Sequence, residues 1–499
     1  MLSDTAAHNS CSVTRNFKTI KFRVTLHCAR HPETSPSLVI RLLDRSTRVV
    51  YGSYVHEALA RESAGVQLAA YLFNITNAEQ FQAGLDHKLK VEEVGPFTYQ
   101  EFRRNEQLEL DFDNNVIRYI PIVRTKFLPA ASVGLPEDIN VTMPNIAMLS
   151  MASKVSSYNF VARMGYNLLT NQLSSKSIVR MTAKDYLWGY NEPLIKLGNT
   201  IMPGFVDFDV LGVLDRLYDK KATHLLELSS KTEDKFAIKT VNGSKGLDKW
   251  GYKNTRKRSI CNSFTNTYEG ISYPPEMTGD RPIRIYRTIL CRFLELDYHG
   301  TTMTRYGVEG LEYKISNRTY QKNEETECLC NEGICVEGVS DLSPCFLGLP
   351  IVLSNAHFMH ADPKLYERIE GIQADEKRHG SSFVIEPKIG IVLGTQFSIQ
   401  VNILVRDVHF NTEASRFSDM IVPVKQPPLL PIQTHYLNLI YFIGPKILLK
   451  IHILFGLLAL GLLGYAARLL YWKYWFSRKK QIVLHPNVRG KLSEEPLMR

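Results

Sequence analysis

The sequence lacks the short motifs that mark most enzymes and nucleic-acid-binding proteins. It has no G-x-S-x-G nucleophile elbow, no H-E-x-x-H metal motif, no P-loop and no dinucleotide fingerprint. It also has no helix-turn-helix, zinc-finger or ribonucleoprotein signature. These absences predict a chain that is not an enzyme, uses no cofactor and does not bind nucleic acid.

A long apolar run is missing from residues 1–65. The stretch SLVIRLL is too short for a signal sequence or a membrane span, and it carries Arg41. We therefore treat residues 1–65 as an atypical N-terminal segment. Either a C-terminal segment alone inserts the chain into a membrane, or this start is incomplete.

Acidic residues are outnumbered by basic ones, and the formal net charge is +10. Part of the excess lies near the C-terminal apolar segment, and another part lies between residues 245 and 258. Without a nucleic-acid-binding motif, a solvated loop is the simplest interpretation of the 245–258 cluster.

One apolar segment near the C-terminus is long enough to cross a membrane. The 17 residues Ile451–Ala467 contain no Lys, Arg, Asp or Glu, and the flanking aromatic residues extend the run to about 20 residues. The basic residues Arg478–Lys480 follow. The positive-inside rule then predicts a membrane-spanning region at 436–476, a cytoplasmic tail at 477–499, and an extracellular or luminal position for the preceding chain.

Eight cysteines are present, and six of them fall between residues 261 and 345. An even cluster ahead of a membrane anchor predicts three disulfides in an oxidising compartment. Six cysteines allow 15 pairings, which these positions alone do not reduce. Zinc binding is a weaker alternative, because the spacing lacks the paired C-x2-C knuckles of zinc sites.

Four sequons for N-glycosylation agree with a secretory-pathway domain. Their acceptor residues are Asn74, Asn140, Asn242 and Asn317.

The pattern of apolar residues divides the chain into three parts. Residues 66–130 are rich in β-branched and aromatic residues and predict strands. The region from about 145 to 228 has apolar residues at spacings of three and four, which predicts helices, one of them starting near Thr182. Strand patterns return from 230 to about 424, with a hairpin punctuated by Gly390 and Gly394. This order predicts a β barrel or sandwich with a helical insertion.

The histidines at 357 and 360, with Asp362, have a spacing that resembles a metal motif. Because this segment lies among predicted strands and no second pair of ligands is evident, we predict packing and hydrogen bonding in a loop and no metal site.

Several ordered blocks resemble the class B scavenger receptor family, which includes a lysosomal integral membrane protein and insect sensory neuron membrane proteins. The resemblance covers roughly residues 66–424. The blocks are YLFNITNAEQFQAG, VEEVGPFTYQEF, DYLWGYNEPLI, NTYEGISYPPEM, ETECLCNEGICVEGVSDLSPC, LSNAHFMHADPKLYERIEGI and FVIEPKIGIVLGTQFSIQVN.

The resemblance implies a mainly β fold. A large antiparallel β barrel would occupy residues 66–435, with a helical-bundle apex at about 145–228 and a disulfide cluster at 261–345. Family members are held by membrane spans at both ends. The family pattern implies the pairs Cys261–Cys328, Cys291–Cys345 and Cys330–Cys335.

The resemblance also implies a function. Family members bind lipidic or anionic ligands at the apex and pass hydrophobic lipid, such as a fatty acid, sterol or phospholipid, through an internal tunnel. The expected partners are therefore lipids or lipoprotein-like particles and the membrane itself. Candidate ligand contacts at the apex are Lys154, Arg163 and Lys176.

Two parts of the chain depart from the family. The N-terminal span is not recognisable in residues 1–60. Before the last span, KQPPLLPIQTHYL replaces a segment that usually contains tryptophan and acidic residues. Both departures concern membrane topology.

The C-terminal tail resembles an acidic dileucine sorting signal that an adaptor would bind. A working signal would place the protein in the endosome or lysosome membrane, and its absence would leave it in the plasma membrane. The alternative function is that of a receptor for a protein ligand such as a luminal hydrolase. The candidate signal consists of Glu494, Glu495, Leu497 and Met498.

Overall fold

The computed structural model of the chain falls into two units, which we describe separately. One contains the strands and the short helices; the other contains the long C-terminal helix. The structure describes residues 48–201, 210–218, 223–288, 290–304, 307–324, 326–330, 336–426, 428–430 and 444–483.

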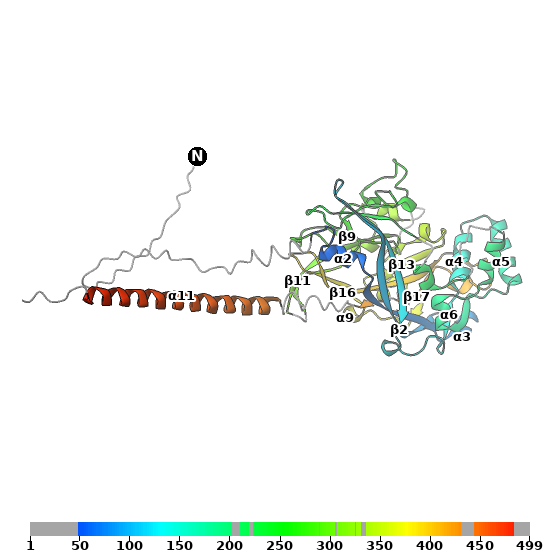
Figure 1. The fold of residues 1–499 in the computed structure, drawn as a ribbon. Helices are drawn as coiled ribbons and strands as arrows, with labels where there is room; N and C mark the ends of the chain where they lie inside the picture. Colours follow the sequence, from blue (N-terminus) through cyan, green and yellow to red (C-terminus); the bar gives the residue numbers. More distant parts are fainter. Residues whose placement is uncertain are drawn as a thin grey trace, which may run out of the picture. The chain divides into compact units, whose positions relative to one another are not determined.

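The larger unit is built on one extensive, mostly antiparallel sheet (Figure 1). Twelve strands follow one another in the order β7-β6-β3-β2-β1-β17-β16-β15-β11-β10-β9-β8. A bridge between Ala237, beside β7, and Tyr268 in β8 joins the two ends of this path. The sheet is therefore a nearly closed barrel, which confirms the predicted fold class.

The strands come from all along the sequence of this unit. They are β1 (Ser63–Ile75), β2 (Leu89–Asp111), β3 (Val116–Phe127), β4 (Asn140–Pro144), β5 (Ile178–Thr182), β6 (Leu226–Ser229), β7 (Ile238–Val241), β8 (Thr267–Tyr268), β9 (Ile283–Arg287), β10 (Arg292–Met303), β11 (Glu309–Ile315), β12 (Val339–Asp341), β13 (Ile351–Asn355), β14 (Ile369–Glu370), β15 (Ser382–Ile385), β16 (Val392–Val405), β17 (Met420–Gln426) and β18 (Pro428–Leu430).

The predicted hairpin of the C-terminal half is present, but only Gly390 separates its strands, because Gly394 lies within β16 and pairs with Val384. Strands β15 and β16 pair antiparallel, and Gly390 between them has a φ of +72°. That backbone conformation favours glycine, because other L-residues bring Cβ too close to the carbonyl. Along β16, Phe397, Ile399 and Ile403 are buried, and so are the intervening Ser398, Gln400 and Asn402, so both faces of this strand are covered.

The helical part lies between β4 and β6, and its helices gather at one edge of the strands (Figure 1). The first two of them lie between β4 and β5 in the sequence. These two strands pair with each other, Asn140 with Thr182 and Pro144 with Ile178. The helices are α4 (Ile146–Val155), α5 (Phe160–Gln172), α6 (Ala183–Trp188), α7 (Pro193–Ile201) and α8 (Val213–Leu217).

Polar caps explain where these helices begin. Thr182 caps α6 by accepting a hydrogen bond from the Asp185 N–H, which confirms the predicted start. The apolar spacing predicted helix from Asn145 onward, and two helices are found. The chain leaves the helical conformation at Asn159, whose side chain caps α5, since an Asn at this position satisfies an otherwise unpaired N–H.

Residues ahead of β1 also pack on the barrel unit. Val49 is buried in a core cluster, and helix α2 (Tyr54–Ala60) follows. The Asn105 side chain on β2 donates to the Leu59 carbonyl at 2.9 Å. Part of the atypical N-terminal segment is therefore folded structure.

The smaller unit contains helix α11 (Gly444–Val483). Within it, the stretch Lys450–Arg478 is 29 residues long and contains an 18-residue window with a mean hydropathy of 2.0. At 1.5 Å per residue such a helix exceeds the ~30 Å hydrocarbon thickness of a bilayer. The predicted C-terminal span is thus one long apolar helix.

Candidate ligand-binding site

The barrel encloses a cavity of about 850 Å³. This volume lies within the range of pockets that bind small molecules. Strands on several sides line it: Leu68 on β1, Leu353 on β13, Ile399 and Val401 on β16, and Val424 on β17. Because alternate residues of each strand face the interior, the cavity wall on this side is largely apolar.

One part of the cavity wall is polar and tightly paired. Arg103 on β2 contacts both carboxylate oxygens of Glu269, at 2.5 and 2.9 Å, and the Tyr119 hydroxyl donates to the same carboxylate at 2.8 Å. Burial alone would raise the pKa of Glu269, but the charge and hydrogen bonds of Arg103 outweigh it and lower the pKa. This pair is ionised and rigid.

A second carboxyl group in the wall behaves in the opposite way. Burial raises the pKa of Glu101, and the hydrogen bond from Tyr218 offsets only part of that effect. Glu101 therefore holds a proton more readily than an ordinary carboxyl group. The wall combines one fixed ion pair with one weakly acidic, hydrogen-bonding carboxyl group.

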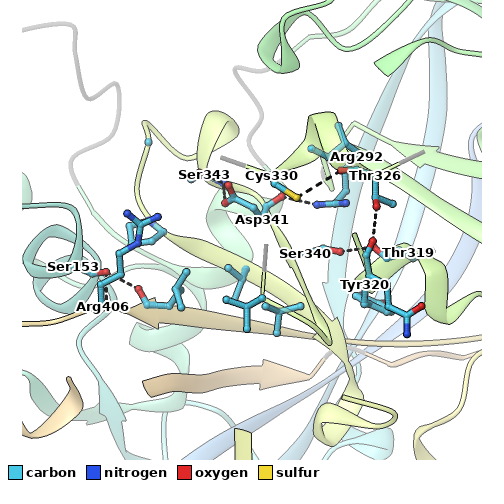
Figure 2. A pocket seen from close by; sticks show the side chains of 18 of the residues that line it. Ser153, Arg292, Thr319, Tyr320, Thr326, Cys330, Ser340, Asp341, Ser343 and Arg406 are labelled. Carbon is cyan, nitrogen blue, oxygen red and sulfur yellow. Dashed lines mark hydrogen bonds between the residues drawn. The ribbon is translucent and has the colours of Figure 1, made fainter. Parts of the chain in front are cut away.

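A separate pocket of about 30 Å³ lies near the cysteine region (Figure 2). Arg292 donates to the Asp341 carbonyl at 2.9 Å, and burial lowers the pKa of Arg292 to about 10. Ser343 donates to the Asp341 carboxylate at 2.9 Å. The volume holds roughly one water molecule, so this pocket is too small for a lipid.

The three cations predicted at the apex occupy different surroundings. Lys154 on α4 lines the small pocket. The pKa of Asp407 is lowered first by hydrogen bonds from His409 and also by the charge of Arg163. These two cations remain predicted ligand contacts.

Lys176, the third predicted cation, is exposed but not alone. It forms an ion pair with Glu413 at 2.7 Å, and its side chain is 61% exposed. Such an exposed pair is worth about 0 to 1 kcal/mol, so an anionic ligand could replace Glu413 at little cost. Lys176 also remains a predicted ligand contact.

Helix α5 presents apolar side chains to solvent. Phe160, Val161, Met164 and Leu168 are 70%, 76%, 50% and 64% exposed. Their spacing places them along one side of the helix, while Tyr166 on another side is buried and donates to the Met148 carbonyl. We call these four residues the α5 stripe; exposed apolar groups of this kind mark interaction sites.

The partners of His357 in the structure are not the residues of the predicted histidine motif. His357 meets Glu93 and His379, not His360 or Asp362: its Nε2 lies 2.7 Å from the Glu93 carboxylate, and its ring stacks on His379 with centroids 3.8 Å apart. Possible ligand atoms of the three lie within 4.8 Å of one another.

The stacking of the two imidazole rings argues against a shared metal ion. Nitrogen lone pairs lie in the ring planes, and the planes here differ by only 8°. Parallel rings do not direct their lone pairs at one point. The cluster fits a hydrogen bond between His357 and Glu93, with His379 stacked on His357, better than a metal centre.

The cysteines form two of the implied pairs. Cys261 is bonded to Cys328, and Cys291 to Cys345, with Cα separations of 6.0 and 6.4 Å. The partner implied for Cys330 is Cys335, which lies outside the described residues. Zinc has no place at Cys328 in this arrangement, because a disulfide sulfur has no thiolate to offer.

The predicted glycosylation sites differ in exposure. Asn140, Asn242 and Asn317 are exposed. Asn74 is half-buried, and its amide nitrogen donates to Glu92 at 2.9 Å. All four remain predictions.

The predicted sorting signal lies outside the described residues, so Glu494, Glu495, Leu497 and Met498 also remain predictions.

Sequence reasoning missed the polar part of the cavity wall and the partners of His357. A signal for Glu101 and Arg103 existed, since both flank Phe102 inside a strand. Nothing local could bring Glu269 to Arg103, because 166 residues separate them.

Comparison with known proteins gives a consistent result. The sequence model of the CD36 family matches residues 36–471. Scavenger receptor class B member 1 of Bos taurus is 25% identical over 464 residues, covering 89% of this chain and 88% of that protein. Lysosome membrane protein 2 of Mus musculus is 27% identical over 396 residues, covering 77% and 79%.

Proposed function

The chain belongs to the CD36 family, and from this premise we propose that it is a membrane receptor that binds lipidic or anionic ligands and passes hydrophobic lipid through the interior of its barrel. The resemblance to class B scavenger receptors is confirmed. By name the relatives are a scavenger receptor and a lysosome membrane protein, and α11 is a candidate span.

The observation that carries the proposal is the 850 Å³ cavity with its apolar strand walls. Transfer of apolar surface from water to such a wall is favourable by ~25 cal/mol per Å². An acyl chain or a sterol ring system would gain this energy on entering. Of the two pockets described above, with volumes of about 850 and 30 Å³, the first alone is large enough for a lipid.

Cations outside the cavity would select the ligands that approach. Lys154, Arg163 and Lys176 are proposed to attract anionic head groups or lipoprotein-like particles. The ion pair of Lys176 with Glu413 is exposed, so a ligand carboxylate competes with it on nearly equal terms.

Catalysis is not part of the proposed function. Family membership favours a receptor. The buried ionisable groups of the cavity wall are paired with one another: Arg103 with Glu269, and Glu101 with Tyr218. We propose that they stabilise the wall.

The test is photocrosslinking of lipid to the full chain in isolated membranes. A fatty acid and a sterol that each carry a photoactivatable group should label peptides of β1, β16 and β17. Val401→Trp, which places a bulky ring in the cavity, should reduce labelling, whereas Lys176→Glu should slow loading without abolishing it. Labelling confined to α11, or labelling unchanged by Val401→Trp, would overturn the cavity as the lipid site.

A second candidate function has its own support. The α5 stripe is an apolar surface without a covering element among the described residues, and it suits a protein ligand such as a luminal hydrolase. Such a receptor would act in endosomes or lysosomes, with the tail signal bound by a sorting adaptor.

A matched pair of substitutions separates this second function from the first. Leu168→Glu places a charge in the α5 stripe, and Leu85→Glu places one at an exposed leucine outside it. Loss of protein ligand only in Leu168→Glu, with lipid labelling retained in both, would establish the α5 stripe as a protein-binding surface. Equal behaviour of the two variants would exclude it.

A further inference from the structure

A single lysine is completely buried within the barrel wall. Lys425 on β17 has 0% exposed surface. In the sheet it lies opposite Leu72 of β1 and Val401 of β16. Lysine is almost never fully buried unless it is paired, so its surroundings decide what it does.

Those surroundings supply no counterion. Among the residues that the structure describes, the Lys425 Nζ has no hydrogen-bond partner. Burial lowers the pKa of Lys425 to about 7, with no offsetting effect from a carboxylate. A buried amine without an acceptor costs free energy that no interaction in the wall returns.

The side chain of Lys425 is on the cavity side of the wall. Directly opposed residues of an antiparallel pair point to the same face, and Val401 lines the cavity. The register shifts here, with Val401 opposite Lys425 and Asn402 opposite Pro423, so Val424 is the extra residue of a β-bulge and lines the cavity beside Lys425. Lys425 adjoins the cavity without lining it, and rotation of its flexible four-carbon chain would carry Nζ inside.

We propose that Lys425 is a specificity-determining residue of the cavity, which binds the acid group of a ligand whose remainder is apolar, such as a long-chain fatty acid. This inference rests on the proposed function. The wall around Val401 and Val424, which both line the cavity, would hold the apolar chain. The ammonium group would then acquire the acceptor that it lacks in the ligand-free chain.

The charge of the site favours a carboxylate over a phosphate. One ammonium group carries one positive charge and three donors. A carboxylate neutralises that charge. A doubly ionised phosphate would leave a second negative charge buried without compensation, which is costly.

The experiment compares three ligands with the same sixteen-carbon photoactivatable chain: the acid, the primary alcohol and the alkyl phosphate. Labelling is measured as a function of ligand concentration on the full chain in membranes. A hydrogen bond to a charged group is worth about 1.5 to 3 kcal/mol. The acid should therefore bind about ten- to a hundredfold more tightly than the alcohol, and more tightly than the phosphate.

Lys425→Met keeps the length of the side chain and removes the charge. In this variant the acid and the alcohol should bind equally, while the alcohol binds as in the unsubstituted chain. Lys126→Met, at an exposed lysine on β3, should leave the preference intact. The ligand-free Met variant should unfold at the same or a higher temperature, since an unpaired buried amine is gone; if it does not fold, Lys425→Gln is judged by the same criterion.

The outcomes distinguish the role of Lys425 from the proposed lipid-binding function of the barrel. If the unsubstituted chain labels with acid and alcohol equally, and Lys425→Met changes nothing, the role of Lys425 is overturned and the lipid-binding function stands. If no ligand labels the barrel, the proposed function itself fails. Tightest binding of the phosphate would overturn the preference for a carboxylate.

Discussion

The pKa of each buried ionisable side chain in this barrel depends on burial and on whether a partner offsets the effect of burial. Glu269 and Glu101 both lie in the cavity wall. The pKa of Glu269 is lowered because Arg103 outweighs burial, whereas burial raises the pKa of Glu101 because the hydrogen bond from Tyr218 and the charges of Arg287 and Arg103 offset it only in part. Lys425 has neither kind of partner. The same physical effect therefore yields an ion pair, a weak acid and an unpaired amine.

The histidine cluster adds sensitivity to acid. His379 is buried, and its pKa is lowered to about 4, first by burial and then by the charge of His357. Glu93 and Asp375 oppose this shift, and Arg378 reinforces it. The unfolded chain binds a proton at this histidine near pH 6.5, while the folded chain resists it.

The free energy of unfolding should consequently fall as the pH drops from about 6.5 toward 4. Above pH 6.5 the contribution of His379 should be fully present, because the imidazole is neutral in both the folded and the unfolded chain. His379→Asn should reduce this loss by about 1 to 3 kcal/mol. The measurement is the unfolding temperature of the full chain between pH 7.5 and 4.5.

The control for this prediction is His409→Asn, since His409 is exposed beside Asp407. It should leave the acid dependence unchanged. Identical pH profiles for the His379 variant and the unsubstituted chain would show that the cluster does not govern acid stability.

Single residues show where sequence reasoning stops. Lys176 was a sensible cation to predict, but its partner Glu413 lies 237 positions away, and only the fold brings them together. Lys425 directly follows the apolar run MIVPV. The predicted strands end at about residue 424, so the burial of Lys425 and its lack of a partner among the described residues are visible only in the structure.

At the scale of elements, local sequence patterns predicted whether a segment is helix or strand better than they predicted where each element ends. The strands of residues 66–130, the Thr182 helix start and the Gly390 hairpin follow from periodicity and capping, which are local properties. The break between α4 and α5 did not follow, because the cap at Asn159 lies within a continuous apolar spacing. The order of strands was also unpredictable, since β1 pairs with β17 from the far end of the unit.

Two asparagine caps hold the helical part with unequal strength. Asn145 is buried; it accepts from the Met148 N–H and donates to the Lys176 carbonyl and to Glu192. Asn159 at the start of α5 is exposed and accepts one bond, from the Ala162 N–H. The first cap ties α4 to the segments before β5 and α7.

Asn145→Ala should therefore cost about 2 to 3 kcal/mol, because besides the helix cap it removes one donor from the buried Glu192 carboxylate and one from the Lys176 carbonyl. Asn159→Ala should cost about 1 kcal/mol, the usual value of an exposed cap. Chemical unfolding of the full chain measures both. Equal losses would mean that Asn145 acts only as a helix cap.

At the scale of the whole molecule, a barrel with a large apolar interior is joined to an apolar helix. The CD36 family model extends over both, since it matches residues 36–471. Composition and hydropathy predicted both the β-rich unit and the span. The cavity was implied only by the family resemblance, because its volume depends on how strands distant in sequence close around it.

The orientation of the chain in its membrane is the property that links both units to function. Lys473 and Arg478 flank one end of the apolar stretch, and positive charge favours the cytoplasmic side. In sealed membrane vesicles with a luminal barrel, added protease should remove a tag at the C-terminus and leave the barrel intact.

Glycan mapping tests the same orientation independently. Asn140→Gln, Asn242→Gln and Asn317→Gln should each remove one glycan, because all three residues are exposed. Asn74→Gln should also remove one, from a site that is less fully occupied, since a glycan there replaces the hydrogen bond to Glu92. A barrel without glycans, combined with a protected C-terminal tag, would reverse the orientation. It would also remove the reason for disulfides, because the cytosol keeps thiols reduced.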